Sequence, residues 1–190
     1  MSRLILDYAN CLDERVGEHG LSANDLEAAA PRLQELTQQL NESRRTGLER
    51  WRNLPVDPMR RDHLDAVNQL VEQFRPRARH LVVLGIGGSA LGNIALQQAL
   101  NGVTYNLLSD EDRRWPRLYV LDNVDPQLVA QTLRFIRSDD PQLRDTVINV
   151  ISKSGETAET AAQFLIVQSM LKELHGEKHA EHIVAVTDPK

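Results

Sequence analysis

The hydrophobic pattern of the chain changes near residue 80. Before that point, apolar residues recur at intervals of three and four, which is the spacing of one helix face. After it, short β-branched and aliphatic runs alternate with helical segments, as is typical of βαβ units in a parallel sheet. The predicted strands are residues 81–84, 118–121, 147–151 and 183–186. We therefore predict an α/β fold, in which a doubly wound parallel sheet follows an N-terminal helical extension.

The helices between these strands are predicted at residues 90–100, 126–137 and 157–174. The middle helix has the clearest start. Asp125 is placed as its N-cap, and Pro126 stands at the first helical position, where a missing N–H costs nothing. The long polar stretch 101–116 is predicted to be a surface loop.

A connector with two prolines separates the helical part from the α/β part. Residues 53–58 read Asn-Leu-Pro-Val-Asp-Pro. Each proline disfavours a helical conformation at the preceding residue and lacks a backbone N–H. We predict a helical extension over residues 1–55 and one α/β domain over residues 56–190.

Composition narrows the classes of partner. With 41% apolar and 26% charged residues, the 190-residue chain can bury one substantial core. Its net charge of −5 and dispersed basic residues argue against nucleic acid and anionic membranes as partners. The single Cys11 excludes an internal disulfide and fits a reducing compartment. No signal peptide or membrane-spanning run is visible, so we expect a cytoplasmic location.

The first candidate site follows the first predicted strand. Residues 85–89 read Gly-Ile-Gly-Gly-Ser, and such glycines let the backbone approach a ligand closely and adopt positive φ. In open parallel sheets, ligands bind beyond the carboxyl ends of the strands, where helix N-termini present unpaired N–H groups. Ser89 is placed to cap the following helix, to touch the ligand, or to do both.

The second candidate site follows the third predicted strand and is richer in donors. Ser152, Ser154 and Thr157 offer hydroxyls, Lys153 offers a cation, and Gly155 offers a flexible turn. A phosphate monoester carries nearly two negative charges and three terminal oxygens that accept hydrogen bonds. The alternative is an ordinary Ser/Thr-rich helix cap with a solvated lysine. The density of donors favours a phosphate site.

Other polar residues support weaker hypotheses. A phosphate dianion would repel Glu156, so we predict that this side chain faces outward from the first helical turn, where the helix dipole favours a carboxylate. Glu159 has the same interpretation, and a catalytic role stays open for both. The histidines lack the ligand set of a zinc site, so we expect no bound metal. They are His80, His175, His179 and His182.

One alternative is a dinucleotide-binding Rossmann domain that takes NAD, because residues 85–90 fit G-x-G-x-x-A between a strand and a helix. That fingerprint also requires an acidic residue about 20 positions further on. Asp122 ends the next strand but lies well beyond that spacing. A nicotinamide domain also has no use for a second hydroxyl-rich anion loop, so this alternative is the weaker one.

A second alternative is a non-catalytic phosphosugar sensor that uses the same two loops to regulate a partner. The loops themselves do not distinguish a sensor from an enzyme. A sensor is expected to carry a DNA-binding helical module, whereas the predicted N-terminal helices lack a basic face. The sequence therefore disfavours this alternative.

Both loops resemble those of phosphoglucose isomerases. Residues 84–92, Leu-Gly-Ile-Gly-Gly-Ser-Ala-Leu-Gly, are typical of that family. Residues 151–160, Ile-Ser-Lys-Ser-Gly-Glu-Thr-Ala-Glu-Thr, resemble the phosphate loop of sugar-isomerase (SIS) domains in general, in the form found in the bacterial type of the enzyme. The resemblance implies that residues 56–190 form the first SIS domain, a three-layer αβα structure, and that the second domain of the family is absent.

The resemblance also implies a function. The family interconverts glucose 6-phosphate and fructose 6-phosphate in glycolysis and gluconeogenesis through a cis-enediol, without a cofactor and typically as a homodimer. By motif position, the residues that would hold the phosphate are Ser152, Lys153 through its backbone, Ser154 and Thr157. Gly88 and Ser89 would border the sugar.

No catalytic residue is carried over. The family's glutamate base, ring-opening histidine and lysine, and stabilising arginine lie downstream of the region matched here. We therefore expect this chain to bind sugar phosphate weakly and to show no turnover by itself.

Overall fold

The structure, a computed structural model, describes residues 5–46, 49–57 and 60–188. The chain falls into two compact units, Met1–Asp65 and Ala66–Lys190. Pro58 of the expected connector lies outside the described residues. A domain boundary after residue 55 stays a prediction.

The described part of the N-terminal unit is mainly helical. It contains α1 (Asp13–Val16) and α2 (Ala23–Thr46), with short 3₁₀ turns at Ala9–Cys11, Gly17–His19 and Arg50–Val56. At the start of α2, the Ser22 hydroxyl accepts a hydrogen bond from the Asp25 N–H, and the Asp25 carboxylate accepts one from the Ser22 N–H. This reciprocal cap explains why the helix begins here. The hydrogen bonds from Ser22 also lower the pKa of Asp25.

Helix α3 (Arg60–Phe74) carries an apolar stripe that stays largely exposed. Val67 and Leu70 are 54% and 40% exposed, and no described residue of the helix is fully buried. The helical periodicity predicted before residue 80 is present, but the apolar face of this helix is not buried. Such a stripe needs a facing apolar surface, and among the described residues none covers it.

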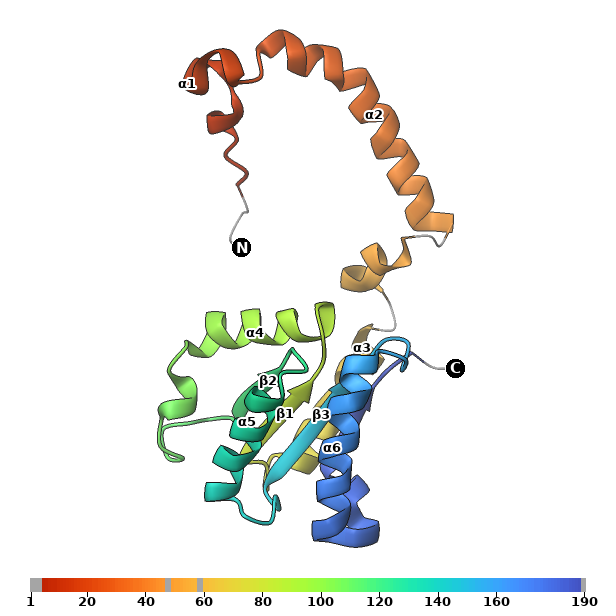
Figure 1. The fold of residues 1–190 in the computed structure, drawn as a ribbon. Coiled ribbons are helices and arrows are strands. Elements are labelled where there is room, and N and C mark those ends of the chain that lie inside the picture. Colours follow the sequence, from red (N-terminus) through yellow and green to blue (C-terminus); the bar gives the residue numbers. More distant parts are fainter. Residues whose placement is uncertain (1–4, 47–48, 58–59, 189–190) are drawn as a thin grey trace. The chain divides into compact units, whose positions relative to one another are not determined.

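The second unit is built around a parallel sheet in the order β2-β1-β3-β4 (Figure 1). The strands are β1 (His80–Leu84), β2 (Arg117–Leu121), β3 (Thr146–Ile151) and β4 (Ile183–Val186). Every predicted strand is present and extends at most one residue further at its start. This confirms the predicted α/β fold.

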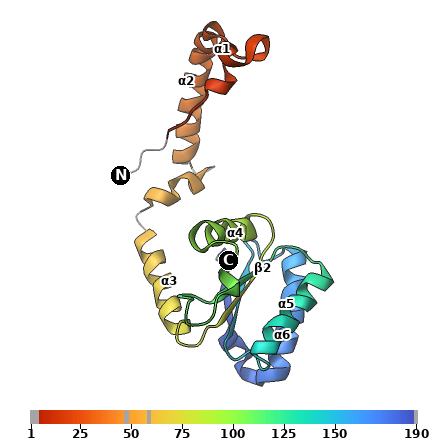
Figure 2. The ribbon, with the colours of Figure 1, turned by 90° about the vertical axis from the view of Figure 1, so that its left-hand side faces the viewer.

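Three helices connect the strands, namely α4 (Gly88–Asn101), α5 (Pro126–Asp139) and α6 (Ala158–His175). Because the strand order reverses at β1, right-handed crossovers place α4 on one face and α5 with α6 on the other. Figure 2 shows α5 and α6 together on one side of the sheet. Alternation along β2 agrees, since Tyr119 packs into the core below α5 while Leu118 and Val120 border α4.

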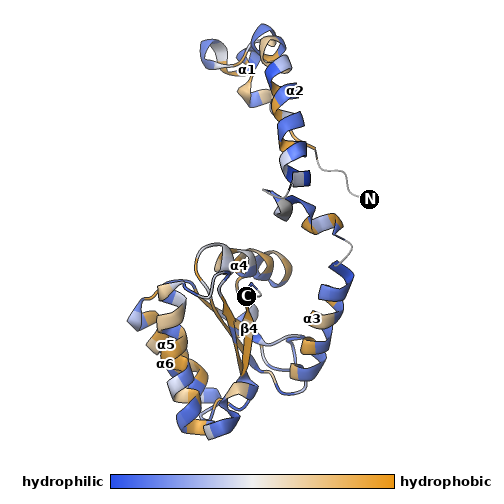
Figure 3. Ribbon diagram, turned by 90° about the vertical axis from the view of Figure 1, so that its right-hand side faces the viewer, coloured by the Kyte–Doolittle hydropathy of each residue, from blue (hydrophilic) through white to orange (hydrophobic). Residues whose placement is uncertain are grey.

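The main core lies between the sheet and helices α5 and α6. The strands of this core stand out as hydrophobic in Figure 3, as expected for a parallel sheet covered by helices. The buried core residues are Val82, Leu84, Leu121, Val129, Leu133, Ile136, Leu143, Ile148, Val167 and Leu171.

A carboxylate organises the turn that leads into β3. Asp140 is buried and accepts hydrogen bonds from the N–H groups of Arg144 and Asp145, each at 2.9 Å, and from the Thr146 hydroxyl at 2.8 Å. Within this turn Leu143 adopts φ 50°, an uncommon conformation for a residue other than glycine. The three bonds to Asp140 and the complete burial of the Leu143 side chain hold that conformation.

An ionic network closes the amino edge of the sheet. Arg79 contacts Asp110 at 2.8 Å and Asp139 at 3.0 Å, and the Nε2 atom of the fully buried His80 lies 3.3 Å from Asp139. Burial lowers the pKa of His80, and Arg117 and Arg79 act in the same direction, whereas Asp139 and Asp140 oppose them. We assign His80 as neutral, because complete burial and two neighbouring guanidinium groups outweigh the two carboxylates.

Within the described ranges, no helix combines the length and apolar character needed to cross a membrane.

Candidate functional site

The two candidate loops are neighbours at the carboxyl edge of the sheet. Strands β1 and β3 are adjacent and parallel, and Leu84 pairs with Val150. The first loop, residues 85–89, follows β1, and the second loop, residues 152–157, follows β3. Parallel strands end at the same edge, so the fold brings together the two segments that the sequence singles out.

The first loop depends on two glycines for different reasons. Gly87 is the N-cap of α4 and has φ 56°, which favours glycine. A Cβ atom on Gly85 would lie 2.9 Å from the Cβ of Ser89. A Cβ on Gly88, in contrast, would meet no atom within 4 Å, so this position faces open space.

Ser89 does not cap α4. The helix begins at Gly88, with Gly87 rather than Ser89 at the N-cap position. The Ser89 hydroxyl makes no hydrogen bond within the described part of the chain, although its backbone carbonyl accepts one from Asn93 at 2.9 Å. Of the two roles considered for this hydroxyl, contact with a ligand is the one left open.

The second loop is held by its own hydroxyl groups. Ser152 is buried, and its hydroxyl donates to Thr157 Oγ1 at 3.2 Å, joining the two ends of the loop. The Ser154 hydroxyl accepts a hydrogen bond from the N–H of Glu156 at 3.1 Å. Gly155 has φ 72°, so the turn between them requires a residue that tolerates the left-handed region.

The backbone of the second loop carries a cluster of unpaired N–H groups. The amides of Lys153, Ser154 and Gly155 have no hydrogen-bond acceptor among the described residues. Thr157 is the N-cap of α6, but its side chain caps no N–H of the first helical turn. These donors and the positive end of the helix dipole form an arrangement suited to an anion with several oxygens.

The charged side chains of the second loop and of the start of α6 lie at the surface. Lys153, Glu156 and Glu159 are all exposed, and neither carboxylate has an ion-pair partner within the described ranges. The placement of Glu156 in the first helical turn is wrong, because α6 begins at Ala158 with Thr157 as its N-cap, whereas Glu159 does lie in that turn. The outward direction of both side chains stays a prediction.

Sequence reasoning missed three residues, two that contact the second loop and one that fixes the helix following it. Gln163 of α6 is 2% exposed and donates to the carbonyls of Leu121 at 3.3 Å and Asn123 at 2.7 Å, which ties α6 to the end of β2. After β4, the Thr187 hydroxyl and the Asp188 N–H both donate to the Lys153 carbonyl. In the sequence, Thr187 and Asp188 could have been found only by their position directly after the last predicted strand, which pairs with β3.

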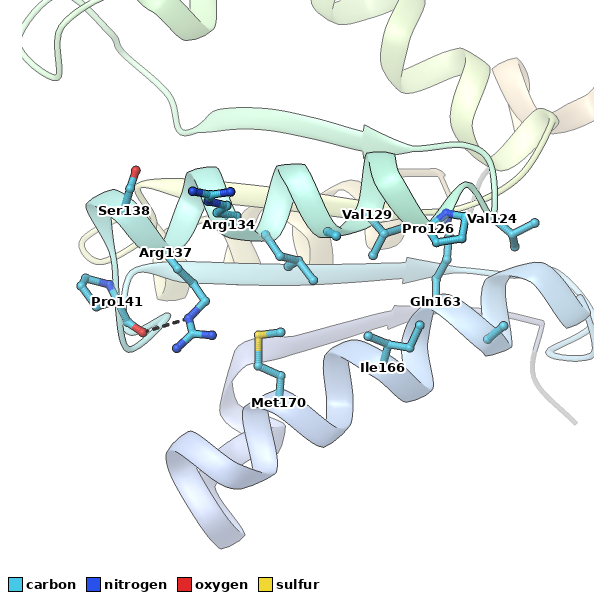
Figure 4. Close-up of a pocket in the computed structure, with 13 residues that line it drawn as sticks. Val124, Pro126, Val129, Arg134, Arg137, Ser138, Pro141, Gln163, Ile166 and Met170 are labelled. Atoms are coloured by element: carbon cyan, nitrogen blue, oxygen red, sulfur yellow. Dashed lines mark hydrogen bonds between the residues drawn. The ribbon is translucent and has the colours of Figure 1, made fainter.

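A separate hollow of about 720 Å³ lies between α5 and α6 (Figure 4). It is lined mainly by apolar side chains such as Val129, Leu133, Ile166 and Met170, and none of its lining residues belongs to either loop. The hollow is therefore distinct from the two candidate loops.

Three of the histidines pack inside the second unit or against one another and do not form a ligand site. His80 and His182 are buried, and His175 stacks on His182 with ring centroids 4.2 Å apart. In the part of the chain that is described, no group of three or more His, Cys, Asp or Glu residues is placed to hold a metal ion.

Taken together, the fold and loops define an α/β protein with a cluster of unpaired N–H groups beyond two adjacent parallel strands. The profile of the family described as phosphoglucose isomerase matches residues 68–190. The chain therefore belongs to the phosphoglucose isomerase family.

Individual relatives agree with this family. Glucose-6-phosphate isomerase of Carboxydothermus hydrogenoformans is 36% identical over 187 residues, which cover 98% of this chain and 39% of that protein. Glucose-6-phosphate isomerase of Rubrobacter xylanophilus is 37% identical over 192 residues, which cover 100% of this chain and 40% of that protein. The chain thus spans about two fifths of the length of these relatives.

A solved structure shows the same fold. The crystal structure of a hypothetical protein from Thermus thermophilus is 34% identical in sequence, with a TM-score of 0.65. The match covers 88% of this chain and 36% of that protein.

Proposed function

We propose that this chain is the phosphate-gripping part of a glucose-6-phosphate isomerase. The observation that carries the proposal is the second loop, where hydroxyl groups and unpaired N–H groups converge at the start of α6 beside the glycine-rich first loop. A sugar phosphate fits because its phosphate needs many donors, while its ring needs a neighbouring surface without bulky side chains.

Each loop has its own part in the proposed complex. The hydroxyls of Ser154 and Thr157 and the backbone N–H of Lys153 bind the phosphate oxygens, and Ser152 supports them through its hydrogen bond to Thr157. Gly88 and Ser89 border the sugar, since a side chain is absent at the first position and the hydroxyl at the second is free of internal bonds in the described structure. Binding of a dianion at this site is also favoured by the dipole of α6.

The proposed reaction is the interconversion of glucose 6-phosphate and fructose 6-phosphate through a cis-enediol. A base takes the proton from C2 of the open-chain aldose and returns it to C1, while a proton moves between the two oxygens, so the atoms balance without an oxidant or a cofactor. We assign these proton transfers to parts of the longer relatives that this chain does not match. The chain alone is therefore expected to bind without turnover.

Calorimetric titration of the chain with glucose 6-phosphate tests the proposal, with NAD and unphosphorylated glucose as comparison ligands. We expect binding of the sugar phosphate only. The double variant Ser154→Ala, Thr157→Val should lose most of this binding, whereas Ser169→Ala, an exposed serine on the same helix α6, should retain it. Binding of NAD without binding of the sugar phosphate would contradict the proposal and favour a dinucleotide-binding domain.

A coupled assay separates binding from catalysis. No isomerase turnover is expected above that of the double variant prepared in the same way. Turnover that is lost in Glu159→Gln would instead assign a catalytic group to this chain.

We also propose, from family membership, that residues 56–190 are an SIS-type domain and that the parent protein is a cytoplasmic homodimer. Size measurement of the longer protein in solution tests the dimer.

A further inference from the structure

The segment that follows β4 contacts the second loop at one backbone carbonyl. The Thr187 hydroxyl donates to the carbonyl of Lys153 at 3.3 Å, and the N–H of Asp188 donates to the same oxygen at 3.0 Å. The end of β3 is also bonded to the end of β4, because the N–H of Ser152 donates to the carbonyl of Val186 at 3.0 Å. Two donors from outside the loop thus hold one of its peptide groups.

The direction of that carbonyl determines the direction of a donor. The described residues contain no cis peptide bond, and in a trans peptide the C=O and the following N–H point in opposite directions. Because the Lys153 carbonyl points toward the β4 segment, the N–H of Ser154 points away from it. That N–H has no acceptor among the described residues. In the strand order, β1 and its glycine-rich loop lie on the side of β3 opposite β4.

Thr187 also lies close to the turn at Gly155 in the second loop. The nearest described atom to a Cβ built on Gly155 is Thr187 Oγ1, at 3.9 Å, and Gly155 itself has φ 72°. A side chain at position 155 would therefore reach the same hydroxyl that holds the carbonyl, which places Thr187 beside this turn. A rotation of that peptide would break both hydrogen bonds to Lys153.

We infer that Thr187, together with the backbone N–H of Asp188, is a positioning residue for the phosphate site, because it holds the Lys153–Ser154 peptide with its N–H directed into the site. This rests on the proposed binding of a sugar phosphate. Thr187 does not touch the ligand in this arrangement. It keeps the Ser154 N–H aligned before the ligand binds, so that binding does not have to order this peptide.

The experiment compares Thr187→Val with Thr187→Ser in the 190-residue chain, titrated with glucose 6-phosphate and with inorganic phosphate. Valine keeps the shape of threonine without the hydroxyl, while serine keeps the hydroxyl. We expect the valine variant to bind both ligands about three- to tenfold more weakly, as for the loss of one hydrogen bond, and the serine variant to bind nearly as well as the unaltered chain. Asp188→Ala keeps the backbone N–H and should retain binding.

The amide signals of the second loop give a readout that a general loss of stability would not produce. In the unaltered chain, phosphate should move the Ser154 amide resonance. In Thr187→Val at ligand saturation, this displacement should be smaller while the thermal midpoint stays close to that of the serine variant. If the unaltered chain binds neither ligand, the proposed function is wrong. If it binds and Thr187→Val binds equally well with the same Ser154 displacement, only the positioning role is wrong.

Discussion

The hydroxyls of Ser152 and Thr157 are joined by a hydrogen bond of 3.2 Å that closes the second loop at its base. Thr157 occupies the N-cap position of α6, where a threonine hydroxyl ordinarily accepts a hydrogen bond from the first helical turn, but here it makes no such bond. The helix start is thus left without its usual side-chain cap, and the free N–H groups are available to an anion.

Replacement of Thr157 by valine should separate binding from stability. The hydroxyl caps no N–H but accepts from the buried Ser152 hydroxyl, so its removal should lower the free energy of unfolding by about 1–3 kcal/mol. Binding of glucose 6-phosphate should fall by roughly 10-fold or more, since a hydrogen bond to a charged group is lost. Urea unfolding and calorimetric titration measure the two effects.

A suitable control is Thr132→Val, a half-buried threonine on α5 away from both loops. It should leave the affinity unchanged. If Thr157→Val lowered stability by several kcal/mol and left the affinity intact, the hydroxyl would be structural and our account of the loop would be wrong.

The two glycines of the first loop should respond differently to alanine. Gly85→Ala places a methyl group 2.9 Å from the Cβ of Ser89, so we expect a loss of stability of about 1–3 kcal/mol. Gly88→Ala meets nothing within 4 Å and lies in the first turn of α4, so the fold should be unaffected or slightly more stable.

The binding result for Gly88→Ala tests the location of the sugar. A methyl group in the space that the sugar ring occupies should weaken binding of glucose 6-phosphate while leaving binding of inorganic phosphate intact. Equal binding of glucose 6-phosphate by Gly88→Ala and the unaltered chain would show that the sugar does not border this residue.

The carboxylate of Asp140 should matter for the fold and not for the site. Asp140→Ala leaves the Arg144 and Asp145 N–H groups and the buried Thr146 hydroxyl without their acceptor, so we expect a loss of about 2–4 kcal/mol in the free energy of unfolding. Asp145→Ala, which removes a carboxylate from the same turn but keeps its backbone N–H, is the matched control. Chemical denaturation of both variants should show a large difference, and similar midpoints would contradict the role given to Asp140.

The sequence was sufficient for the features that depend on local patterns. The strands were recognisable because buried parallel strands are continuous apolar runs. The start of α5 was predicted correctly, since the Asp125 carboxylate accepts hydrogen bonds from Gln127 and Leu128 and Pro126 is the first helical residue. The adjacency of the two loops follows from the strand order, which the sequence alone did not provide.

The features that were missed depend on contacts distant in sequence. Thr187 reaches the Lys153 carbonyl across 34 positions, and Gln163 reaches Asn123 across 40. Periodicity and motif spacing contain no information on such pairs. The capping role considered for Ser89 was also not found, because Gly87 with its positive φ precedes Ser89 and occupies the N-cap position itself.

The stability of the chain should fall as the pH drops below about 6.5, the ordinary pKa of histidine. Burial lowers the pKa of both His80 and His182, with the hydrogen bond to the Thr146 carbonyl opposing the effect at His182. Below about pH 6.5 the unfolded chain binds protons that the folded chain does not bind, so protonation favours unfolding until the pH falls through the lowered folded-state pKa values. The stabilising difference is fully present above this pH.

Urea unfolding between about pH 8 and pH 5 measures this slope, which is up to about 1.4 kcal/mol per pH unit for each histidine. His80→Gln removes one titrating group and should flatten the curve in this range, whatever its effect on stability at the alkaline end. His63→Gln, at an exposed histidine of α3, controls for the substitution itself. If the slope of His80→Gln matched that of the unaltered chain, the pKa of His80 would be the same in the folded and unfolded chain, and its assignment as a buried neutral histidine would be wrong. A steeper slope in His80→Gln would instead indicate a charged pair with Asp139.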